Sequence, residues 1–406
     1  MCDASLSPPR PLGHSRRHYN MDDGMGRKRV LVAMSGGVDS SVAAALLLEQ
    51  GYEVVGVTMR LWTIEDPTAP RFHRRCCSVE DVVDAQTAAQ VLGIPHYVLN
   101  FERPFKAMVV DYFVHEYSQG RTPNPCIACN QHVKFGPLLE YALALGCDYV
   151  ATGHYVRVRR QGDRFLLLKG VDAAKDQSYV LYMLGQRELS RSLFPVGEYT
   201  KAEVRALARR LGLPNADKPD SSDICFIPDG DYRSFLRRYL SPRPGPIVDL
   251  DGRVLGHHQG IIDFTVGQRR GLPHSSHGRP LYVVDIHAPT NTVVVGPEEE
   301  LLCWELTCRA LSFVDDVPPK GPLAVEAKAR YRGETVPALL EVLDGQGRVR
   351  LLRPLRAVTP GQAIVFYQGE RVIGGGIIAR RGWAGEDAHA IIAKHSAAPG
   401  GGDGHQ

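Results

Sequence analysis

The segment KRVLVAMSGGVDSSVAAALLLEQG (residues 28–51) constrains the fold more than any other part of the chain. Residues 28–34 form an apolar run, which is typical of a parallel strand buried on both faces. The pair Gly36 and Gly37 follows, and residues 42–51 predict a helix that ends at Gly51. A loop between a strand and a helix directs backbone N–H groups and the helix N-terminus at one spot, so this segment predicts a site for an anion.

The same order of elements continues through the first half of the chain. Apolar runs predict strands at residues 52–62, 94–101 and 147–155, and helical patterns lie between them at residues 78–93, 104–120 and 134–146. This alternation predicts an α/β fold, with a doubly wound parallel sheet covered by helices on both faces.

The pattern changes after about residue 220. A short helix is expected at residues 230–240, and proline and glycine then become frequent. Short apolar runs separated by turn residues predict strands at residues 323–332, 336–344, 348–355, 362–368 and 371–380. Several short strands at this spacing favour a small antiparallel β-barrel at the C-terminal end.

These changes divide the chain into five parts. We expect a disordered leader (1–27), a nucleotide-binding catalytic domain (28–222), a small central linker domain that carries Cys225 (223–288), a C-terminal β-barrel (289–380) and a disordered tail (381–406). The leader and the tail are poor in apolar residues and rich in glycine and polar residues, which is the composition of disordered segments.

Charge and cysteine content limit the class of protein. The formal net charge of +3 is too small to indicate nucleic-acid binding by itself, although basic clusters occur locally. The sequence has no apolar span long enough for a membrane helix and no secretory signal. The count of nine cysteines is odd, so we expect no disulfide framework and a reducing cytoplasm.

The loop AMSGGVDS (residues 33–40) is the first candidate site. Gly36 and Gly37 let the backbone approach a phosphate, and the serines can donate hydroxyls. A carboxylate beside a phosphate is repulsive unless a cation lies between them, so Asp39 predicts a Mg²⁺ ion. The loop lacks the Gly-Lys-Ser/Thr ending of a Walker loop and resembles the PP-loop, S-G-G-x-D-S, of ATP pyrophosphatases, whose fold is adenine nucleotide alpha hydrolase-like.

The predicted ATP-binding residues follow from this loop and from two strand ends. Met59 and Gly153 end later strands, where a doubly wound sheet presents its nucleotide crevice. The predicted set is Ala33, Met34, Ser35, Gly36, Gly37, Val38, Asp39, Ser40, Met59 and Gly153.

Two cysteines follow Asn-Pro in GRTPNPCIACN (residues 120–130). Asn124 suits a helix N-cap and Pro125 the first helical position, which places Cys126 and Cys129 on one face near a helix start. A dipole there stabilises a thiolate. The spacing alone leaves open a zinc half-site, a redox disulfide, an iron–sulfur half-site or a catalytic thiol pair, although no second compact ligand pair for zinc follows. Cys225, in SSDICFI, is a third candidate thiol.

Together these segments resemble a known family. AMSGGVDS, GRTPNPCIACN, VKF, ATGHY, KDQSYVLY, LFPVGEYTKAEVR, SSDICFI, HHQGIIDFTVGQRRGL and TPGQAIVFYQGERVIGGGII are similar to motifs of the tRNA-specific 2-thiouridylases (MnmA). The resemblance runs from about Lys28 to Arg380 and keeps the order of the family's motifs.

The resemblance implies a reaction. ATP adenylates O2 of the wobble uridine (U34) of tRNA, pyrophosphate leaves, and a persulfide on Cys225 supplies sulfur to C2 as AMP departs. The family's nucleophile matches Cys129, which either attacks the persulfide or closes a disulfide with Cys225 after transfer. The positions that match tRNA contacts are Asn124, Pro125, Cys126, His154, Lys175, Asp176, Gln177, Arg330, Tyr331 and Gln362.

One position departs from the best-described family pattern. That pattern has an Asp where this chain has Cys126, whereas a second pattern in the family has the same C-x-x-C as this chain. The resemblance then allows an alternative in which Cys126, Cys129 and Cys225 hold a [4Fe–4S] cluster with one open iron. In that alternative the thiols are metal ligands and not persulfide carriers.

The resemblance also implies partners. We expect tRNA with lysine, glutamate or glutamine acceptors, a cysteine desulfurase or sulfur-relay protein, and a monomer in the cytoplasm. Two hypotheses from other classes of protein compete with this one. The first is a PP-loop synthetase resembling amidotransferases, which would tolerate Cys225→Ser. The second is a non-catalytic RNA-binding protein, which would retain tRNA without releasing pyrophosphate.

Overall fold

The computed structural model describes residues 27–62, 79–220, 224–227, 230–273 and 278–382. Two compact units divide the chain, one made of residues 1–106 and 130–228 and the other of residues 107–129 and 229–406. The leader (apart from Arg27), almost all of the predicted tail, and the adjacent cysteines Cys76 and Cys77 lie outside the described residues.

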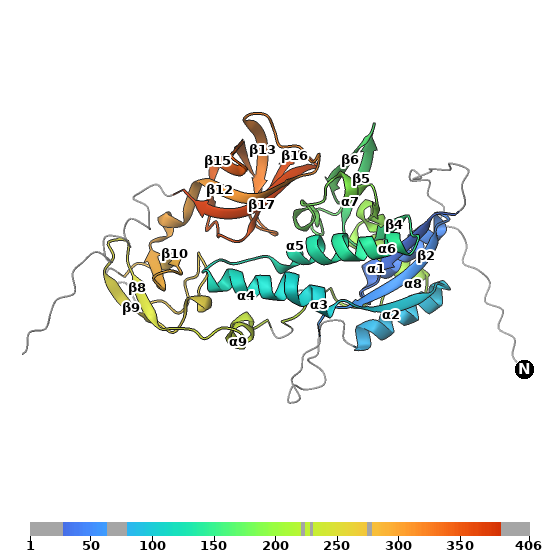
Figure 1. Cartoon of the computed structure of the whole chain (residues 1–406), viewed down its shortest axis with the longest axis horizontal. Coiled ribbons are helices and arrows are strands. Elements are labelled where there is room, and N and C mark those ends of the chain that lie inside the picture. Colours follow the sequence, from blue (N-terminus) through green and yellow to red (C-terminus); the bar gives the residue numbers. More distant parts are fainter. Residues whose placement is uncertain (1–26, 63–78, 221–223, 228–229, 274–277, 383–406) are drawn as a thin grey trace, which may run out of the picture. The chain divides into compact units, whose positions relative to one another are not determined.

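A five-stranded, fully parallel sheet forms the centre of the first unit, with the strand order β3-β2-β1-β4-β7. Figure 1 labels two of its strands, β2 and β4. The first strand is buried at its three central residues, as its unbroken apolar run predicts. The prediction of a parallel sheet is therefore confirmed. The strands are β1 (Arg29–Ala33), β2 (Glu53–Arg60), β3 (His96–Asn100), β4 (Tyr149–Ala151) and β7 (Ser192–Leu193).

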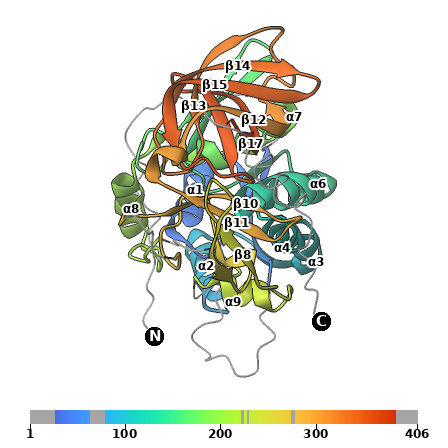
Figure 2. The same cartoon turned by 90° about the vertical axis from the view of Figure 1, so that its left-hand side faces the viewer.

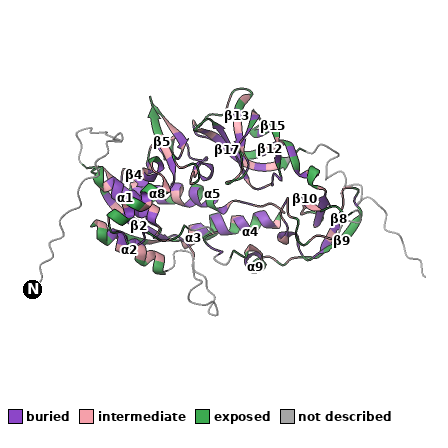
Figure 3. Ribbon diagram, turned by 180° about the vertical axis from the view of Figure 1, so that it is seen from behind, coloured by how far each residue is buried: buried purple, intermediate pink, exposed green. Residues whose placement is uncertain are grey.

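Helices lie on both faces of this sheet. Apolar residues of α1, α2 and α8 form one core with Val30 and Val32 of β1, and α6 packs on β4. Figure 3 colours most of α1 as buried. The helical segments of the unit are α1 (Val38–Glu49), α2 (Val79–Leu92), α3 (Glu102–Phe105), η3 (Asn130–Leu138), α6 (Leu139–Ala144), η4 (Ser178–Val180), α7 (Gln186–Leu189), η5 (Pro195–Glu198) and α8 (Lys201–Arg210).

Two features of this unit differ from the expectation. Helix α1 begins at Val38 and not near residue 42, because Gly37 has the extended backbone of an N-cap and the next four residues are already helical. A hairpin of β5 (Val156–Gln161) and β6 (Arg164–Lys169) was not predicted. Its first strand is rich in arginine, so it lacks the apolar pattern from which strands are inferred.

The second unit contains a four-stranded sheet with the order β10-β11-β8-β9, in which only β11 and β8 run parallel. Strand β11 is buried throughout, and its valines alternate between two apolar cores on opposite faces. The strands are β8 (Gly245–Val248), β9 (Val254–His258), β10 (Tyr282–His287) and β11 (Thr292–Gly296). The helical segments are η2 (Lys106–Val110), α4 (Asp111–Ser118), α5 (Pro125–Cys129), α9 (Tyr232–Arg237), η6 (Ile261–Asp263) and η7 (Glu298–Leu301).

A closed antiparallel barrel completes the second unit (Figure 2). Its six strands follow the order β12-β15-β14-β13-β16-β17, and the pairing of β12 with β17 closes it. Cys303 and Cys308 point into its apolar core, so these two thiols have a packing role. The barrel prediction is confirmed, although β12 was not expected. The strands are β12 (Leu302–Phe313), β13 (Leu323–Lys328), β14 (Val336–Leu343), β15 (Gln346–Arg356), β16 (Ala363–Gln368) and β17 (Arg371–Arg381).

Among the described helices, none combines the length and the apolar character that crossing a membrane requires.

Candidate active site

The loop between β1 and α1 is held from within and from the neighbouring strand. Ser40 Oγ accepts a hydrogen bond from the Ser35 amide at 3.2 Å and donates one to the Gly37 carbonyl at 3.1 Å. Thr58 on β2 donates to the Met34 carbonyl at 2.7 Å. No side-chain oxygen caps α1, because its N-cap is Gly37. The first turn of α1 therefore presents its amides to the loop, as an anion site requires.

Two glycines are required by close contacts around this loop. Gly36 has φ of +76°, and a Cβ there would lie 2.3 Å from the Asp81 carbonyl oxygen. A Cβ at Gly153, just after β4, would lie 2.6 Å from the Ser40 amide nitrogen. Only glycine fits at either position without displacing backbone. Gly153 thus contacts the loop directly, and its predicted approach to a nucleotide remains a prediction.

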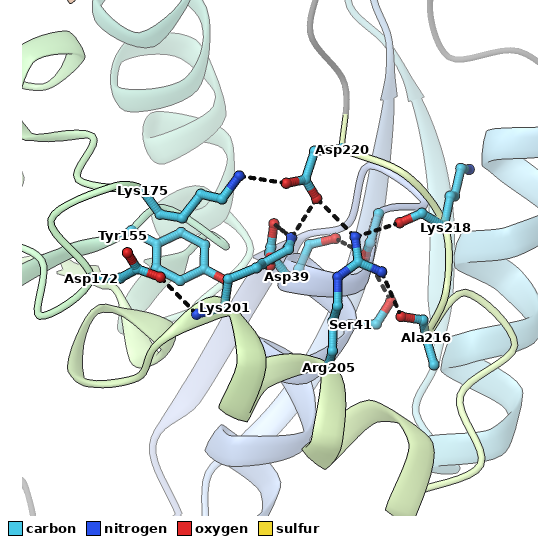
Figure 4. Close-up of polar contacts among 12 residues, drawn as sticks. Asp39, Ser41, Tyr155, Asp172, Lys175, Lys201, Arg205, Ala216, Lys218 and Asp220 are labelled. Carbon is cyan, nitrogen blue, oxygen red and sulfur yellow. Dashed lines mark hydrogen bonds and ion pairs between the residues drawn. The ribbon is translucent and has the colours of Figure 1, made fainter. Parts of the chain in front are cut away.

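The carboxylate of Asp39, in the first turn of α1, is the centre of a charged cluster (Figure 4). Lys201 Nζ lies 2.8 Å from both of its oxygens, and the Tyr155 hydroxyl donates to Oδ1 at 2.7 Å. Lys201 Nζ also lies 2.8 Å from Asp220 Oδ1. One ammonium group therefore joins the loop carboxylate to a second carboxylate from residue 220, beyond α8.

Asp220 has two further cationic partners. Lys175 Nζ lies 2.7 Å from Oδ2, and Arg205 Nη2 lies 3.2 Å from Oδ1. Partial burial alone would raise the pKa of Asp220, but the hydrogen bonds and charges of Lys175 and Lys201 lower it to about 2. Burial, followed by the hydrogen bond to Asp39, raises the pKa of the Tyr155 hydroxyl, so Tyr155 is a hydrogen-bond donor at neutral pH.

A second lysine lies on the other side of the loop. Lys218 Nζ is 2.6 Å from Asp81 Oδ1 and from Asp84 Oδ2, both on α2, and 3.3 Å from the Gly36 carbonyl. Asn215 Nδ2 donates to the same carbonyl at 3.1 Å. Burial would lower the pKa of Lys218, but its hydrogen bonds to the two aspartates raise it. This cluster fixes the loop backbone and does not touch its carboxylate.

The three predicted tRNA-contacting residues of the 175–177 segment differ in their surroundings. The Asp176 carboxylate accepts from the Gly170 amide at 3.0 Å and from the Ser178 hydroxyl at 2.8 Å. Gln177 Oε1 accepts from the Tyr155 amide at 2.9 Å. Asp176 and Gln177 therefore hold the shape of the segment, whereas the Lys175 side chain remains partly exposed.

Two other predicted residues lie in the interior of the first unit. His154 Nδ1 is 2.6 Å from Thr152 Oγ1, and its ring packs beside Phe135 and Phe194. Burial, and then the nearby Lys134 charge, lower the pKa of His154, so its ring is neutral. Met59 is 7% exposed near the end of β2. Contact of either residue with a ligand remains a prediction.

Cys225 is exposed at a turn that is anchored by its neighbours. Phe226 and Ile227 are buried, and the Phe226 ring packs edge-on against Phe105 with ring centroids 5.7 Å apart. The Ile227 amide donates to the Ile224 carbonyl at 2.9 Å, which closes the turn. The sequence therefore buries the two apolar residues after Cys225 and leaves its thiol at the surface.

The C-x-x-C pair lies in α5, in the second unit. The Asn124 side-chain oxygen accepts from the amides of Cys126 at 3.1 Å and Ile127 at 3.4 Å, and Pro125 is the first helical residue, so the predicted N-cap is confirmed. Cys126 is exposed and Cys129 is buried. The two thiols therefore do not face the same surroundings, although they lie only three positions apart in the helix.

The barrel fixes the segment that leads into α5. Gln362 Nε2 donates to the Thr122 carbonyl at 2.8 Å, and the Thr122 amide donates to the Pro360 carbonyl at 2.9 Å. Gly361 has φ of +91° and packs on the Thr122 backbone. Gln362, predicted to contact tRNA, thus has a structural partner close to Asn124.

Arg330 and Tyr331 follow β13 and are not part of the strand itself. Arg330 donates to the Ala357 carbonyl, and Arg330 and Gln362 both line a cavity of about 430 Å³ in the second unit. Arg356 and Gln268 add polar groups to the same cavity. These side chains can offer hydrogen bonds and positive charge to a polar ligand, and their contact with tRNA remains a prediction.

In the described residues, no group of three or more His, Cys, Asp or Glu side chains is arranged to hold a metal ion. The alternative in which Cys126, Cys129 and Cys225 carry an iron–sulfur cluster stays a prediction. Asp39, with a side chain 30% exposed beside an uncapped helix, fits the magnesium of a bound nucleotide as a single carboxylate ligand.

The sequence reasoning found the loop but missed Lys201, Tyr155, Asp220 and Lys218 around it. Lys201 and Tyr155 lie inside the family-like segments LFPVGEYTKAEVR and ATGHY, whose local patterns do not mark either residue as functional. One local signal was available: Lys201 is the first residue of α8, where the helix dipole disfavours a cation.

The fold and the loop can now be compared with known proteins. The parallel sheet and the SGGVDS loop at the end of its first strand define a nucleotide-binding protein of the PP-loop class. Residues 28–229 match the family model described as tRNA methyl transferase HUP domain, residues 233–297 the tRNA methyl transferase PRC-barrel domain, and residues 304–378 the aminomethyltransferase beta-barrel domain. Within this class, the chain belongs to the tRNA-specific 2-thiouridylase MnmA family.

Curated relatives support this membership over their whole length. A tRNA-specific 2-thiouridylase MnmA of Carboxydothermus hydrogenoformans is 52% identical over 88% of this chain and 100% of its own. Relatives from Caldanaerobacter subterraneus subsp. tengcongensis and Chloroflexus aurantiacus are each 51% identical, over 87% and 86% of this chain and 98% of their own. A solved 4-thiouridine synthetase–RNA complex with bound ATP is 18% identical over 52% of this chain and 50% of that one; its TM-score of 0.30 is too low to support a conclusion.

Proposed function

We propose that this chain catalyses the ATP-dependent 2-thiolation of the wobble uridine of tRNA. The observation that carries the proposal is the SGGVDS loop at the carboxyl edge of the sheet, where an uncapped helix start and the Asp39 carboxylate meet, in a chain about half identical to curated 2-thiouridylases throughout. The competing hypotheses, a synthetase and a non-catalytic RNA-binding protein, account for this full-length similarity less well.

The first half-reaction activates the base. The uridine O2 attacks the α-phosphorus of ATP, the bond from that phosphorus to the bridging oxygen breaks, and the oxygen leaves with its electron pair in pyrophosphate. The proton on N3 of the base passes to solvent. The loop amides bind the phosphates and Asp39 binds their Mg²⁺. The activated carbon C2 then carries AMP, a far better leaving group than the original oxygen.

The second half-reaction inserts sulfur. The terminal sulfur of a persulfide on Cys225 attacks C2, and AMP leaves with the bonding electron pair. The Cys129 thiolate then attacks Cys225 Sγ, which releases 2-thiouridine and forms a Cys129–Cys225 disulfide that an external thiol reduces. In the variant of this scheme, Cys129 attacks the persulfide first and the released hydrosulfide attacks C2. Exposure of Cys225 supports its loading by a donor protein.

The remaining expectations belong to the same proposal. The tRNA substrates carry lysine, glutamate or glutamine, and a cysteine desulfurase or relay protein supplies the persulfide in the cytoplasm to a monomer. A wobble base must leave its stack to reach such a site, and basic side chains hold the flanking phosphates. The predicted cationic contacts are Lys175, which is partly exposed and pairs with Asp220, and Arg330, which lines the cavity of the second unit.

The test is a reconstitution with unmodified tRNA, Mg²⁺–ATP and a persulfide donor, followed by mass spectrometry of the tRNA nucleosides. Wild type should form 2-thiouridine at position 34 with one AMP and one pyrophosphate per base. Cys225→Ser should form none, while Cys147→Ala, at a buried cysteine of the same unit, should retain activity. Thiolation by Cys225→Ser at the wild-type rate, or thiolation without ATP, contradicts the proposal.

A further inference from the structure

Lys201 occupies a position that its own helix disfavours. Helix α8 begins with a capping box, in which Thr200 Oγ1 accepts from the Glu203 amide and Glu203 Oε2 accepts from the Thr200 amide. Lys201 is the next residue, where the positive end of the helix dipole repels a cation. Its side chain is only 12% exposed, although lysine is among the residues least often buried. The contacts of its ammonium group must account for this placement.

Those contacts connect Lys201 to the nucleotide loop. The ammonium lies 2.8 Å from each oxygen of Asp39, and Asp39 belongs to the first turn of α1 at the end of SGGVDS. The Tyr155 hydroxyl donates to Oδ1 of the same carboxylate and fixes its orientation. Figure 4 shows Lys201 and Asp220 meeting beside Asp39.

Lys201 can leave these carboxylates without stranding either one. Asp220 keeps Lys175 at 2.7 Å and Arg205 at 3.2 Å. Asp39 keeps the Tyr155 hydrogen bond and is the residue that suits the Mg²⁺ of a nucleotide. Removing the only partner of a buried charge costs much free energy. Because each carboxylate keeps another partner, the departure of Lys201 costs less. In the described part of the chain, Lys201 is the cation that contacts the Asp39 carboxylate.

We propose that Lys201 is a catalytic residue of ATP cleavage: its ammonium leaves Asp39 when Mg²⁺–ATP binds, and contacts the β- and γ-phosphates. This inference rests on the proposed function and names the residue that balances the charge of the departing pyrophosphate. Lys201 transfers no proton in this step. The bond between the α-phosphorus and the bridging oxygen breaks, the oxygen keeps the electron pair, and the ammonium stabilises the negative charge that develops there.

The proposal separates two ligands that bind the same site. Pyrophosphate contains the groups that Lys201 contacts, whereas AMP lacks them. Lys201→Met keeps the length of the side chain and removes the charge, so it should weaken Mg²⁺–pyrophosphate binding at least tenfold and AMP binding less than threefold. Isothermal titration calorimetry on the full chain measures both, and Arg209→Met is the control, because Arg209 is on the same helix but pairs with Asp217 at the surface.

A second readout needs no nucleotide. In wild type the ammonium already neutralises Asp39, so Mg²⁺ alone should leave the melting temperature unchanged within 1 °C. In Lys201→Met that carboxylate lacks the ammonium. The melting temperature of this variant should therefore be higher in buffer with Mg²⁺ than in buffer without divalent metal. This readout tests whether Mg²⁺ can take the place of the ammonium at Asp39, and the pyrophosphate titration tests the contact of Lys201 with phosphate.

The outcomes distinguish this inference from the function on which it rests. Wild type that binds neither ATP nor pyrophosphate overturns the proposed function. Wild type that binds both, with Lys201→Met weakened equally for AMP and pyrophosphate or unchanged for both, overturns the role of Lys201 alone. If Lys201→Met fails to fold, Lys201→Met/Asp220→Asn is titrated against Asp220→Asn, since the second change removes one of the two carboxylates that Lys201 contacts. The same tenfold loss of pyrophosphate binding is required.

Discussion

Lys201 and Lys218 lie on opposite sides of one loop, and each forms ion pairs with two aspartates. They differ in the part of the loop that they contact. Each ammonium contacts two aspartates at 2.6–2.8 Å. The aspartates of Lys218 come from α2, and its third contact is the Gly36 carbonyl. Lys201 instead contacts Asp39, the carboxylate of the loop itself.

This difference shows that ion-pair geometry alone does not identify a functional residue. Lys218 fixes backbone, and nothing in a bound nucleotide would replace its partners. Lys201 holds a carboxylate that a metal ion can take, and its second partner has other cations. The informative property is whether a ligand can take the place of the partners of each lysine, and this property differs between the two sides of the loop.

The largest expected difference concerns the two carboxylates that the lysines hold. Asp39→Asn should lower the rate of tRNA-dependent pyrophosphate release about 100-fold or more, because it removes charge that positions Mg²⁺–ATP for the transition state. Asp81→Asn on the other side should lower it less than about fivefold, since the Asp81 carboxylate pairs with Lys218, which holds loop backbone. A coupled pyrophosphate assay at saturating ATP measures both. Equal losses in the two variants would remove the distinction between the two sides.

Gly36 tests the backbone that the Lys218 side holds. Gly36→Ala places a methyl group against the Asp81 carbonyl at a positive φ, so it should lower the free energy of unfolding by about 2–4 kcal/mol. Gly51→Ala is the matched control: Gly51 also has a positive φ but has no atom within 4 Å of its Cβ position, and its cost should be about 1 kcal/mol. Urea unfolding measures both, and similar values would show that the contact with α2 is unimportant.

The sequence predicted those parts of the fold that depend on short-range pattern. The buried run of residues 28–34 identified β1, and Asn124 with Pro125 identified the start of α5, because each signal is complete within a few residues. The β5–β6 hairpin escaped prediction, since its arginines hide the strand pattern. Strand β12 also escaped, although its residues alternate between barrel core and surface.

The residues of the candidate site likewise differ in whether the sequence alone could reveal them. Gly36 and Asp39 were recognisable because the loop is one continuous motif. Lys201 and Asp220 come from 162 and 181 residues further along the chain, and only folding brings them to Asp39. Periodicity and spacing carry no information about such a contact. The position of Lys201 at a helix start was the one visible irregularity, and violations of local preference of this kind mark functional sites.

Removing the second lysine should affect stability more than chemistry. Lys218→Met removes one ammonium from two partly buried carboxylates, Asp81 and Asp84, so we expect a loss of about 1–2 kcal/mol in the free energy of unfolding. Affinity for pyrophosphate should fall less than about threefold, in contrast to Lys201→Met. Arg187→Met, which breaks an exposed pair with Glu140, should cost less than about 0.5 kcal/mol. A tenfold loss of pyrophosphate binding in Lys218→Met would mean that both lysines contact the ligand.

The smallest expected effect is the pH dependence of Asp220, which measures how well its remaining cations neutralise it. Its pKa of about 2 lies below the ordinary value of 3.8, so the ionised group stabilises the fold above about pH 4 and loses that contribution as the pH falls from about 4 to 2.

Asp220→Asn should therefore lower the melting temperature by about 2 °C at pH 7, a modest shift because the carboxylate is partly exposed and screened by solvent. The difference from wild type should shrink between pH 4 and pH 3, and 1 M NaCl should reduce it at pH 7. Asp217→Asn, in an exposed pair with Arg209, should differ from wild type by less than about 0.5 °C at pH 7. A difference at Asp220 that is constant from pH 7 to pH 3 would show that shape and hydrogen bonding, and not charge, hold residue 220 beside Lys201. The partners that free Lys201 for a phosphate would then be uncharged contacts, and the exchange inferred for this side of the loop would lose its electrostatic basis.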